Sequence, residues 1–184
     1  MKRIPAPVIT FIDANGKELT LSEPLDYGTV DAGQTVEYSG NPVYIWNMYS
    51  GNPSGVSTIE NVKITTITMV PTDANGDDPT TPVASGREVV SEKWVQAKSS
   101  GYHGFSGGYP EWDPTTEYPI QSGDMQTEWT PIGGVDKGDW LSIGDINPSG
   151  ARSVYFRIAT PSDATPAGAN QSIYFKTRVS FTYV

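Results

Sequence analysis

The sequence predicts an all-β protein built as an antiparallel sandwich or barrel, and three observations lead to that fold class. The 184 residues include 15 prolines and 19 glycines, which interrupt the chain too often for long helices. Short runs of β-branched and aromatic residues alternate with polar ones at the two-residue period of a strand. Turn-forming residues bound nearly every run. Hydrophobic residues make up 36% of the chain, so we expect one packed domain over residues 1–184.

The clearest alternation lies in the last residues of the chain. Phe175 and Val179 point to one side of a predicted strand over residues 173–183, and the charged residues between them, Lys176 and Arg178, point to the other. Residues 154–159 alternate in the same way. A segment rich in turn-forming residues, 161–170, separates the two runs. We therefore predict that 154–159 and 173–183 form an antiparallel pair.

The remaining strands are predicted from shorter runs. Residues 8–12 and 17–21 flank an Asp-Ala-Asn-Gly turn at 13–16, so we expect a hairpin there. Further predicted strands cover residues 35–38, 43–47, 62–70, 89–97 and 141–146.

The stretch 87–98 also has apolar residues at helical spacing. An amphipathic helix is therefore the alternative for this stretch, but we favour a strand, because Val89, Val90, Trp94 and Val95 prefer a pleated surface. Trp46, Trp94 and Trp140 lie in or beside predicted strands and are therefore expected in the core.

Residues 99–128 break this rhythm and are predicted to form one long insertion or extended loop. The segment is rich in glycine, proline and aromatic residues, and structureless loops of this length are uncommon in compact domains. Its aromatic side chains either pack on one another, contact another protein, or stack on a carbohydrate. The candidate interface or ligand-contact residues are Tyr102, Phe105, Tyr109, Trp112 and Tyr118.

Charge and composition exclude several classes of partner. The net charge of −9 repels polyanions, so no nucleic-acid partner is expected. Basic residues are scattered, and no run of about 20 apolar residues is present, so neither membrane binding nor a membrane span is expected. The first residues also lack the apolar core of about 7–15 residues that a secretory signal needs. The absence of cysteine excludes disulfides and thiol chemistry.

No residue pattern in the sequence indicates an enzyme. His103 is the single histidine, and no nucleophile motif accompanies it. Glu111, Asp113 and Glu117 resemble the acidic pair of a glycosidase, but residues so close in sequence seldom face each other across a bond. We expect these acids to keep a loop soluble.

A calcium site is the one cofactor that the residues suggest. Asp73, Asn75 and Asp77 reproduce the opening alternation of an EF-hand loop, but position 78 is Asp where glycine is needed, and position 84 is Ala where an acid is needed. A plain turn between strands is the favoured interpretation, with calcium binding in another geometry as the alternative. No other cofactor is expected.

Two stretches resemble immunoglobulin-like modules. Residues 25–34, which read Leu-Asp-Tyr-Gly-Thr-Val-Asp-Ala-Gly-Gln and lead into 43–47, are similar to the opening of such modules. Residues 141–148, 154–158 and 161–168 are similar to their closing strands, in which a "Pro, x, Asp, Ala, x, x, Gly" turn precedes the last strand. The resemblance implies an immunoglobulin-like antiparallel β-sandwich, with residues 99–128 as its departure from the pattern.

A lone module of this kind, without cysteine, resembles the small structural proteins of tailed-phage particles, which include tail, baseplate and capsid-decoration components. The resemblance implies a non-enzymatic virion protein, assembled in the host cytoplasm. It would act through interfaces with other virion proteins and with repeated copies of itself. One alternative is a carbohydrate-binding or lectin-like module that contacts a host-surface glycan through the aromatic segment 99–128. A second alternative is a bacterial surface adhesion domain.

Overall fold

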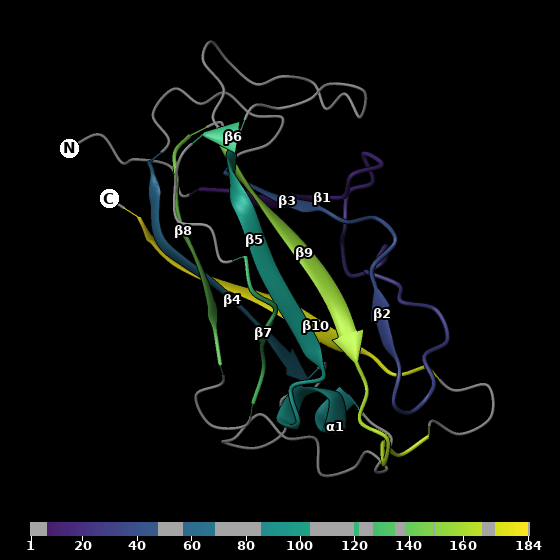
Figure 1. Ribbon diagram of the computed structural model, residues 1–184. Coiled ribbons are helices and arrows are strands. Elements are labelled where there is room, and N and C mark those ends of the chain that lie inside the picture. The colour runs from purple at the N-terminus through teal and green to yellow at the C-terminus, as the bar shows by residue number, and fades with distance from the viewer. Residues whose placement is uncertain are drawn as a thin grey trace.

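The computed structural model describes residues 7–47, 57–68, 86–103, 120–121, 127–134, 139–148, 150–166 and 172–183 (Figure 1). Within these residues the chain forms strands and one short helix, which confirms the predicted all-β class. The elements are β1 (Ile9–Ile12), β2 (Thr35–Glu37), β3 (Val43–Asn47), β4 (Ile59–Thr68), α1 (Gly86–Ser91), β5 (Val95–His103), β6 (Ile120–Gln121), β7 (Thr130–Pro131), β8 (Leu141–Ile146), β9 (Ala151–Ala159) and β10 (Phe175–Tyr183).

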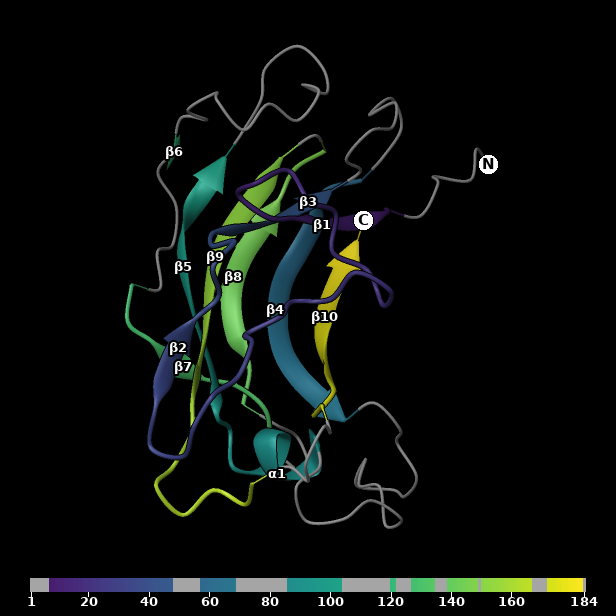
Figure 2. The same cartoon turned by 90° about the vertical axis from the view of Figure 1, so that its right-hand side faces the viewer.

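The described strands form two antiparallel sheets. The larger sheet has seven strands in the order β1-β3-β9-β5-β6, with β2 also paired to β9 and β7 also paired to β5. The smaller sheet has three strands in the order β10-β4-β8. Figure 2 shows the small sheet beside the large one, with β10 at its outer margin. Helix α1 lies at one end of the two sheets (Figure 1).

The larger of two hydrophobic clusters in the described residues lies between the sheets. Alternate residues of the central strands point into it, so that Val154 and Phe156 of β9 are buried, as are Leu141 and Ile143 of β8. This is the alternation that a two-sheet packing requires. The core thus fixes which face of each strand remains in contact with solvent.

The expected core positions of the tryptophans are confirmed in part. Trp46 is 0% exposed and Trp94 is 5% exposed. Trp140, which precedes β8, is only half-buried, and its ring lies near the guanidinium of Arg178. Its position therefore departs from the expectation.

The predicted pairing of residues 154–159 with 173–183 is wrong. Both runs are strands, but β9 pairs with β2, β3 and β5 in the large sheet. β10 instead pairs with β4 in the small sheet. The chain between β9 and β10 therefore crosses from one sheet to the other. Neighbours in sequence need not be neighbours in a sheet once a connection of this length joins them.

The predicted strand over residues 89–97 is wrong in its first half. Val89 and Val90 belong to α1, and the strand begins only at Val95. The helix ends because Lys93 adopts the left-handed conformation, with φ of 57°. The amides of Lys93 and Trp94 then donate to the carbonyls of Val90 and Val89, which is a Schellman cap. Burial of the two valines against the sheets outweighs their strand preference.

The predicted hairpin around residues 13–16 is present only as a turn. The turn forms, but β1 pairs with β3, and residues 17–21 contribute only an isolated bridge between Ile12 and Glu18. The other predicted strands are found with shifted ends, except for β3 and β8, whose bounds match the prediction. The predicted insertion over 99–128 begins as a strand, because β5 continues to His103.

Candidate interaction surfaces

The site residues expected from sequence lie almost entirely outside the described part of the structure. Tyr102 is in β5, where its backbone pairs with Arg152 and Gln121, but the position of its side chain is outside that part. The same holds for His103. The other candidate contact residues lie outside the described residues: Phe105, Tyr109, Trp112 and Tyr118. The residues of the calcium alternative also lie outside them: Asp73, Asn75 and Asp77. Their roles remain predictions.

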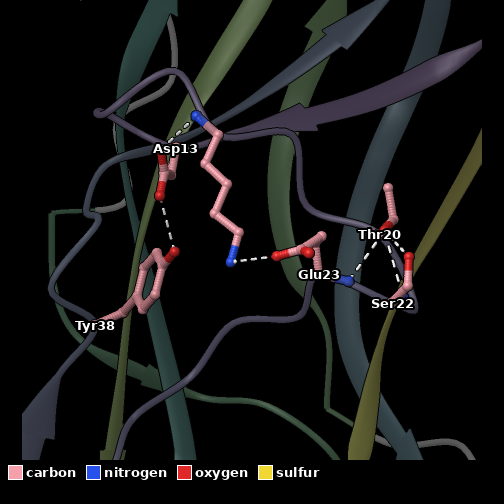
Figure 3. Close-up of polar contacts among 6 residues, drawn as sticks. Asp13, Thr20, Ser22, Glu23 and Tyr38 are labelled. Atoms are coloured by element: carbon pink, nitrogen blue, oxygen red, sulfur yellow. Dashed lines mark hydrogen bonds and ion pairs between the residues drawn. The ribbon is translucent and has the colours of Figure 1, made fainter.

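A buried carboxylate is the first cluster in the described residues with potential chemistry. Asp13 is 2% exposed, and its Oδ1 accepts hydrogen bonds from the amides of Asn15 and Lys17, both at 2.9 Å. Its Oδ2 accepts the hydroxyl of Tyr38 at 2.9 Å. Figure 3 shows Tyr38 pointing at Asp13. Nearby, the Lys17 ammonium forms an ion pair with Glu23 Oε2 at 3.1 Å.

These contacts make Asp13 a structural group. Three donors occupy its two oxygens, and two of them close the turn that sequence reasoning placed at residues 13–16. The pKa of Tyr38 is raised well above its ordinary value, first by burial and then by the hydrogen bond to Asp13. Burial likewise raises the pKa of Tyr27, whose ring lies 6.2 Å from that of Tyr38. Both phenols are thus held neutral, as packing groups.

The outer edge of β10 is the first candidate interaction surface. β10 is nine residues long and pairs with β4 on one side only, and no other described strand pairs with its second side. It contains no proline and no glycine. The register shift between Ser180 and Thr182 comes from an additional residue in β4, so β10 itself stays regular. An edge with these properties can pair with another strand.

The opposite margin of the small sheet is different. β8 has six residues, and Gly144 at its centre adopts a φ of 80°. Its pairing with β4 is interrupted by two register shifts. Bulges and irregular backbone of this kind discourage edge-to-edge pairing. The open, regular edge of the small sheet is therefore that of β10.

A row of aromatic and cationic side chains on the outer face of the large sheet is the second candidate surface. Lys98 on β5 lies opposite Tyr155 on β9, and its Nζ is 4.5 Å from the Trp129 ring centroid and 5.3 Å from that of Tyr155. Arg157 lies opposite Gln96, and its guanidinium carbon is 4.4 Å from the Trp129 centroid. These four residues, Lys98, Trp129, Tyr155 and Arg157, are called the cation–aromatic row below.

The two cations of the row have no carboxylate partner among the described residues. No ion pair within that part of the chain involves Lys98 or Arg157. Glu37 is opposite Arg157 on β2, yet Arg157 instead donates from Nε to Gln96 Oε1 at 2.8 Å and lies over Trp129. In a chain with 21 acidic and 12 basic residues, two such cations on one face stand out.

A surface hollow of about 410 Å³ adjoins the row at Gln96. Two hydrogen-bonded polar pairs lie at it: Trp94 Nε1 donates to Glu92 Oε2 at 3.0 Å, and Lys93 Nζ contacts Asp139 Oδ2 at 2.5 Å. The rest of the lining consists of Pro131 of β7, Ala159 at the end of β9, and Thr160 and Pro161, which follow β9. The row and the hollow together form one continuous surface, because Gln96 belongs to the hollow and is bonded to Arg157.

Comparison with family models, with curated proteins and with solved structures finds no match to this chain. Within the described residues, no helix has the length and hydrophobicity needed to cross a bilayer. The resemblance to immunoglobulin-like phage modules therefore rests on the sequence motifs alone.

Sequence reasoning missed the cation–aromatic row, although part of its signal was readable. Tyr155 and Arg157 occupy the outward positions of a strand that was predicted correctly. Lys98 lies one residue beyond the predicted strand 89–97, and Trp129 lies in a segment with no predicted element. Only the pairing of β7 with β5 and of β5 with β9 brings the four side chains together.

Proposed function

We propose that the chain is a non-enzymatic structural or attachment protein that assembles through the edge of β10, first with a second copy of itself. The observation that carries this proposal is the nine-residue strand with one side unpaired among the described residues. Such an edge offers a row of backbone N–H and C=O groups to another strand. Each hydrogen bond formed there contributes about 0.5–1.5 kcal/mol net.

The charges along β10 favour an antiparallel, two-fold pairing of copies. If two strands pair antiparallel about Val179, Arg178 faces Ser180 of the other copy, and Lys176 faces Thr182. No like charges are then directly opposite. A parallel in-register pairing would instead stack Lys176 on Lys176 and Arg178 on Arg178, which is unfavourable. The antiparallel arrangement is also a closed two-fold interface, the commonest kind in soluble oligomers.

Thr182 provides a direct test of this pairing. In the chain it pairs with Glu60 of β4, whereas in the proposed dimer it faces Lys176 of the other copy. Thr182→Lys should therefore weaken the dimer and Thr182→Glu should strengthen it. Each contact occurs twice by symmetry, so we expect a change of about 2- to 30-fold in the dimer dissociation constant. Sedimentation equilibrium over a range of protein concentrations measures it.

The same two substitutions should change the free energy of unfolding of the single chain in the opposite direction. Chain stability and dimer dissociation can therefore be distinguished. Thr182→Lys faces Glu60 favourably within the chain, and Thr182→Glu does not. Thr35→Lys and Thr35→Glu on β2 are matched controls, because they change the net charge equally at an exposed position of the other sheet. A wild-type chain that stays monomeric up to millimolar concentration, or Thr182 variants that behave like their Thr35 controls, would contradict the proposal.

The resemblance of residues 25–47 and 141–168 to phage immunoglobulin-like modules supports a phage-like particle as the setting of this assembly. Tail, baseplate and capsid decoration all use repeated copies of small domains. The partners would be further copies and other virion structural proteins, assembled in the host cytoplasm. Mass spectrometry of purified particles tests this setting: we expect the chain in stoichiometric amounts, and its loss on washing and banding would refute a virion role.

A further inference from the structure

The cation–aromatic row holds two positive charges at fixed positions on an otherwise acidic protein. Lys98 is placed between the rings of Trp129 and Tyr155, and Arg157 lies over Trp129 while it is bonded to Gln96. Cation–π contacts keep both head groups close to the sheet without neutralising them. The Arg157 guanidinium makes no other hydrogen bond with described residues. Within the described part of the chain, its terminal nitrogens have no hydrogen-bond acceptor, and an anion could occupy that position.

We propose that this face binds a carboxylate-bearing saccharide. The sugar carboxylate is bound by Lys98 and Arg157, and the neighbouring hydroxyl groups are bound in the hollow at Glu92 and Gln96. Thr160 also lines the hollow, but its hydroxyl is already bonded to Asp31 and Gln34. An arginine fork is suited to a planar carboxylate, and a side chain that is already positioned loses less entropy on binding. This site lies on the large sheet and is independent of the assembly role proposed for β10.

The charges around the site fix the orientation of the sugar. Successive outward residues of a strand are about 7 Å apart, so the pair Gln96–Arg157 lies about 7 Å along the sheet from the pair Lys98–Tyr155. The hollow begins at Gln96. In the hollow, Glu92 accepts a hydrogen bond from Trp94, and the charge of Lys93 is paired with Asp139, which lies outside the lining. The Glu92 carboxylate repels a second anion but accepts hydroxyl donors. The anionic end of the ligand therefore belongs at the row and its hydroxyl end at the hollow.

The same polarity favours a saccharide over an acidic protein segment. A run of aspartate or glutamate side chains would satisfy Lys98 and Arg157, but it would also bring carboxylates toward Glu92. It would offer no hydroxyl donors to the hollow. An acidic sugar carries both kinds of group within one or two rings, so it can reach the row and the open hollow at the same time.

Isothermal titration calorimetry with defined sugars tests the proposal. The probes are a uronic-acid trisaccharide and a sialylated trisaccharide, which represent two sources of the same chemistry, with the neutral counterpart of each and a glutamate oligopeptide for comparison. We expect at least one acidic sugar to bind with a Kd of about 1 mM or tighter. Its neutral counterpart and the peptide should bind at least about tenfold more weakly, and added salt should weaken the acidic sugar.

Variants locate the binding. Lys98→Gln and Arg157→Gln should each weaken the acidic sugar at least about tenfold, whereas Lys63→Gln, which removes a lysine from β4 of the other sheet, should not. If a glutamine variant fails to fold, Lys98→Arg and Arg157→Lys retain the charge and should retain salt-sensitive binding.

Three results would overturn the inference: no acidic sugar with a Kd of about 1 mM or tighter, equal binding of the neutral counterparts, or equal binding of the glutamate peptide. The Thr182→Lys variant separates this inference from the assembly proposal. It should bind the sugar as the wild-type chain does, and Lys98→Gln should self-associate normally.

Discussion

Tyr27 and Tyr38 lie edge to face in one cluster, but only the hydroxyl of Tyr38 has a hydrogen-bond partner among the described residues. Tyr38 donates to Asp13, whereas the buried hydroxyl of Tyr27 makes no hydrogen bond with described residues. Tyr38→Phe should therefore lower the free energy of unfolding by about 1–3 kcal/mol, because it removes a donor from a buried carboxylate. Tyr27→Phe should leave it unchanged or raise it. Urea denaturation at neutral pH compares the two variants, and equal losses would contradict the assignment.

The raised pKa values of these tyrosines predict a loss of stability in alkali. Below the ordinary pKa of 10.0 both phenols are neutral in the folded and the unfolded chain, so their contribution is complete. Above that value the unfolded chain releases protons that the folded chain retains, and unfolding becomes more favourable. Urea denaturation at a series of pH values from about 8 to 11 should show this decline. Tyr27→Phe should show a smaller decline, and an identical one would argue against burial as its cause.

Single residues differ in how far their roles could be read from the sequence. The turn at Asp13 was predictable, because an Asx side chain bonds to the amides that follow it. The partner of that carboxylate was not, since Tyr38 is 25 positions away in sequence. The outward positions of Tyr155 and Arg157 followed from alternation. The stacking of both cations on Trp129 did not, because it depends on strand neighbours.

Strand β4 carries a local irregularity that controls its pairing. Asn61 has a φ of 54°, and at this point the register with both β8 and β10 shifts. Asn61→Val should lower the free energy of unfolding by about 1–2 kcal/mol, because a β-branched residue is strained in the left-handed region. Asn61→Gly is the matched control and should be tolerated, since the backbone amide keeps its bond to Asp145. Thermal unfolding measures the stability of both variants. Equal losses would contradict the claim that strain in the left-handed conformation of residue 61 destabilises the valine variant.

Elements were predictable where the local pattern and the packing agree. The bounds of β3 and β8 match the prediction, and both strands begin with the expected alternation: Val43 and Ile45 of β3 and Leu141 and Ile143 of β8 are buried, and the residues between them are more exposed. Residues 89–97 show the opposite case. The local preference of Val89 and Val90 is for a strand, but both are buried in a helical turn that ends at Lys93. No local signal distinguishes a buried helical turn from the first residues of a strand.

The topology as a whole was beyond the sequence, because it depends on which strands are neighbours. The last two strands were expected to pair and are found in different sheets, so the small sheet has β10 at its edge. This placement leaves one long regular edge on the small sheet and the cation–aromatic row on the outer face of the large one. The fold thereby separates a surface for assembly from a surface for a small anionic ligand.

Hydrogen exchange of the β10 amides, followed by NMR at low and high protein concentration, tests the assembly claim most directly. In a chain that pairs only with β4, alternate amides of β10 point outward and exchange at the same rate at every concentration. The proposed dimer predicts that this alternate set becomes protected as concentration rises, and that Thr182→Lys delays the change while Thr182→Glu advances it. Outward amides that exchange at one rate at every concentration would contradict assembly through β10.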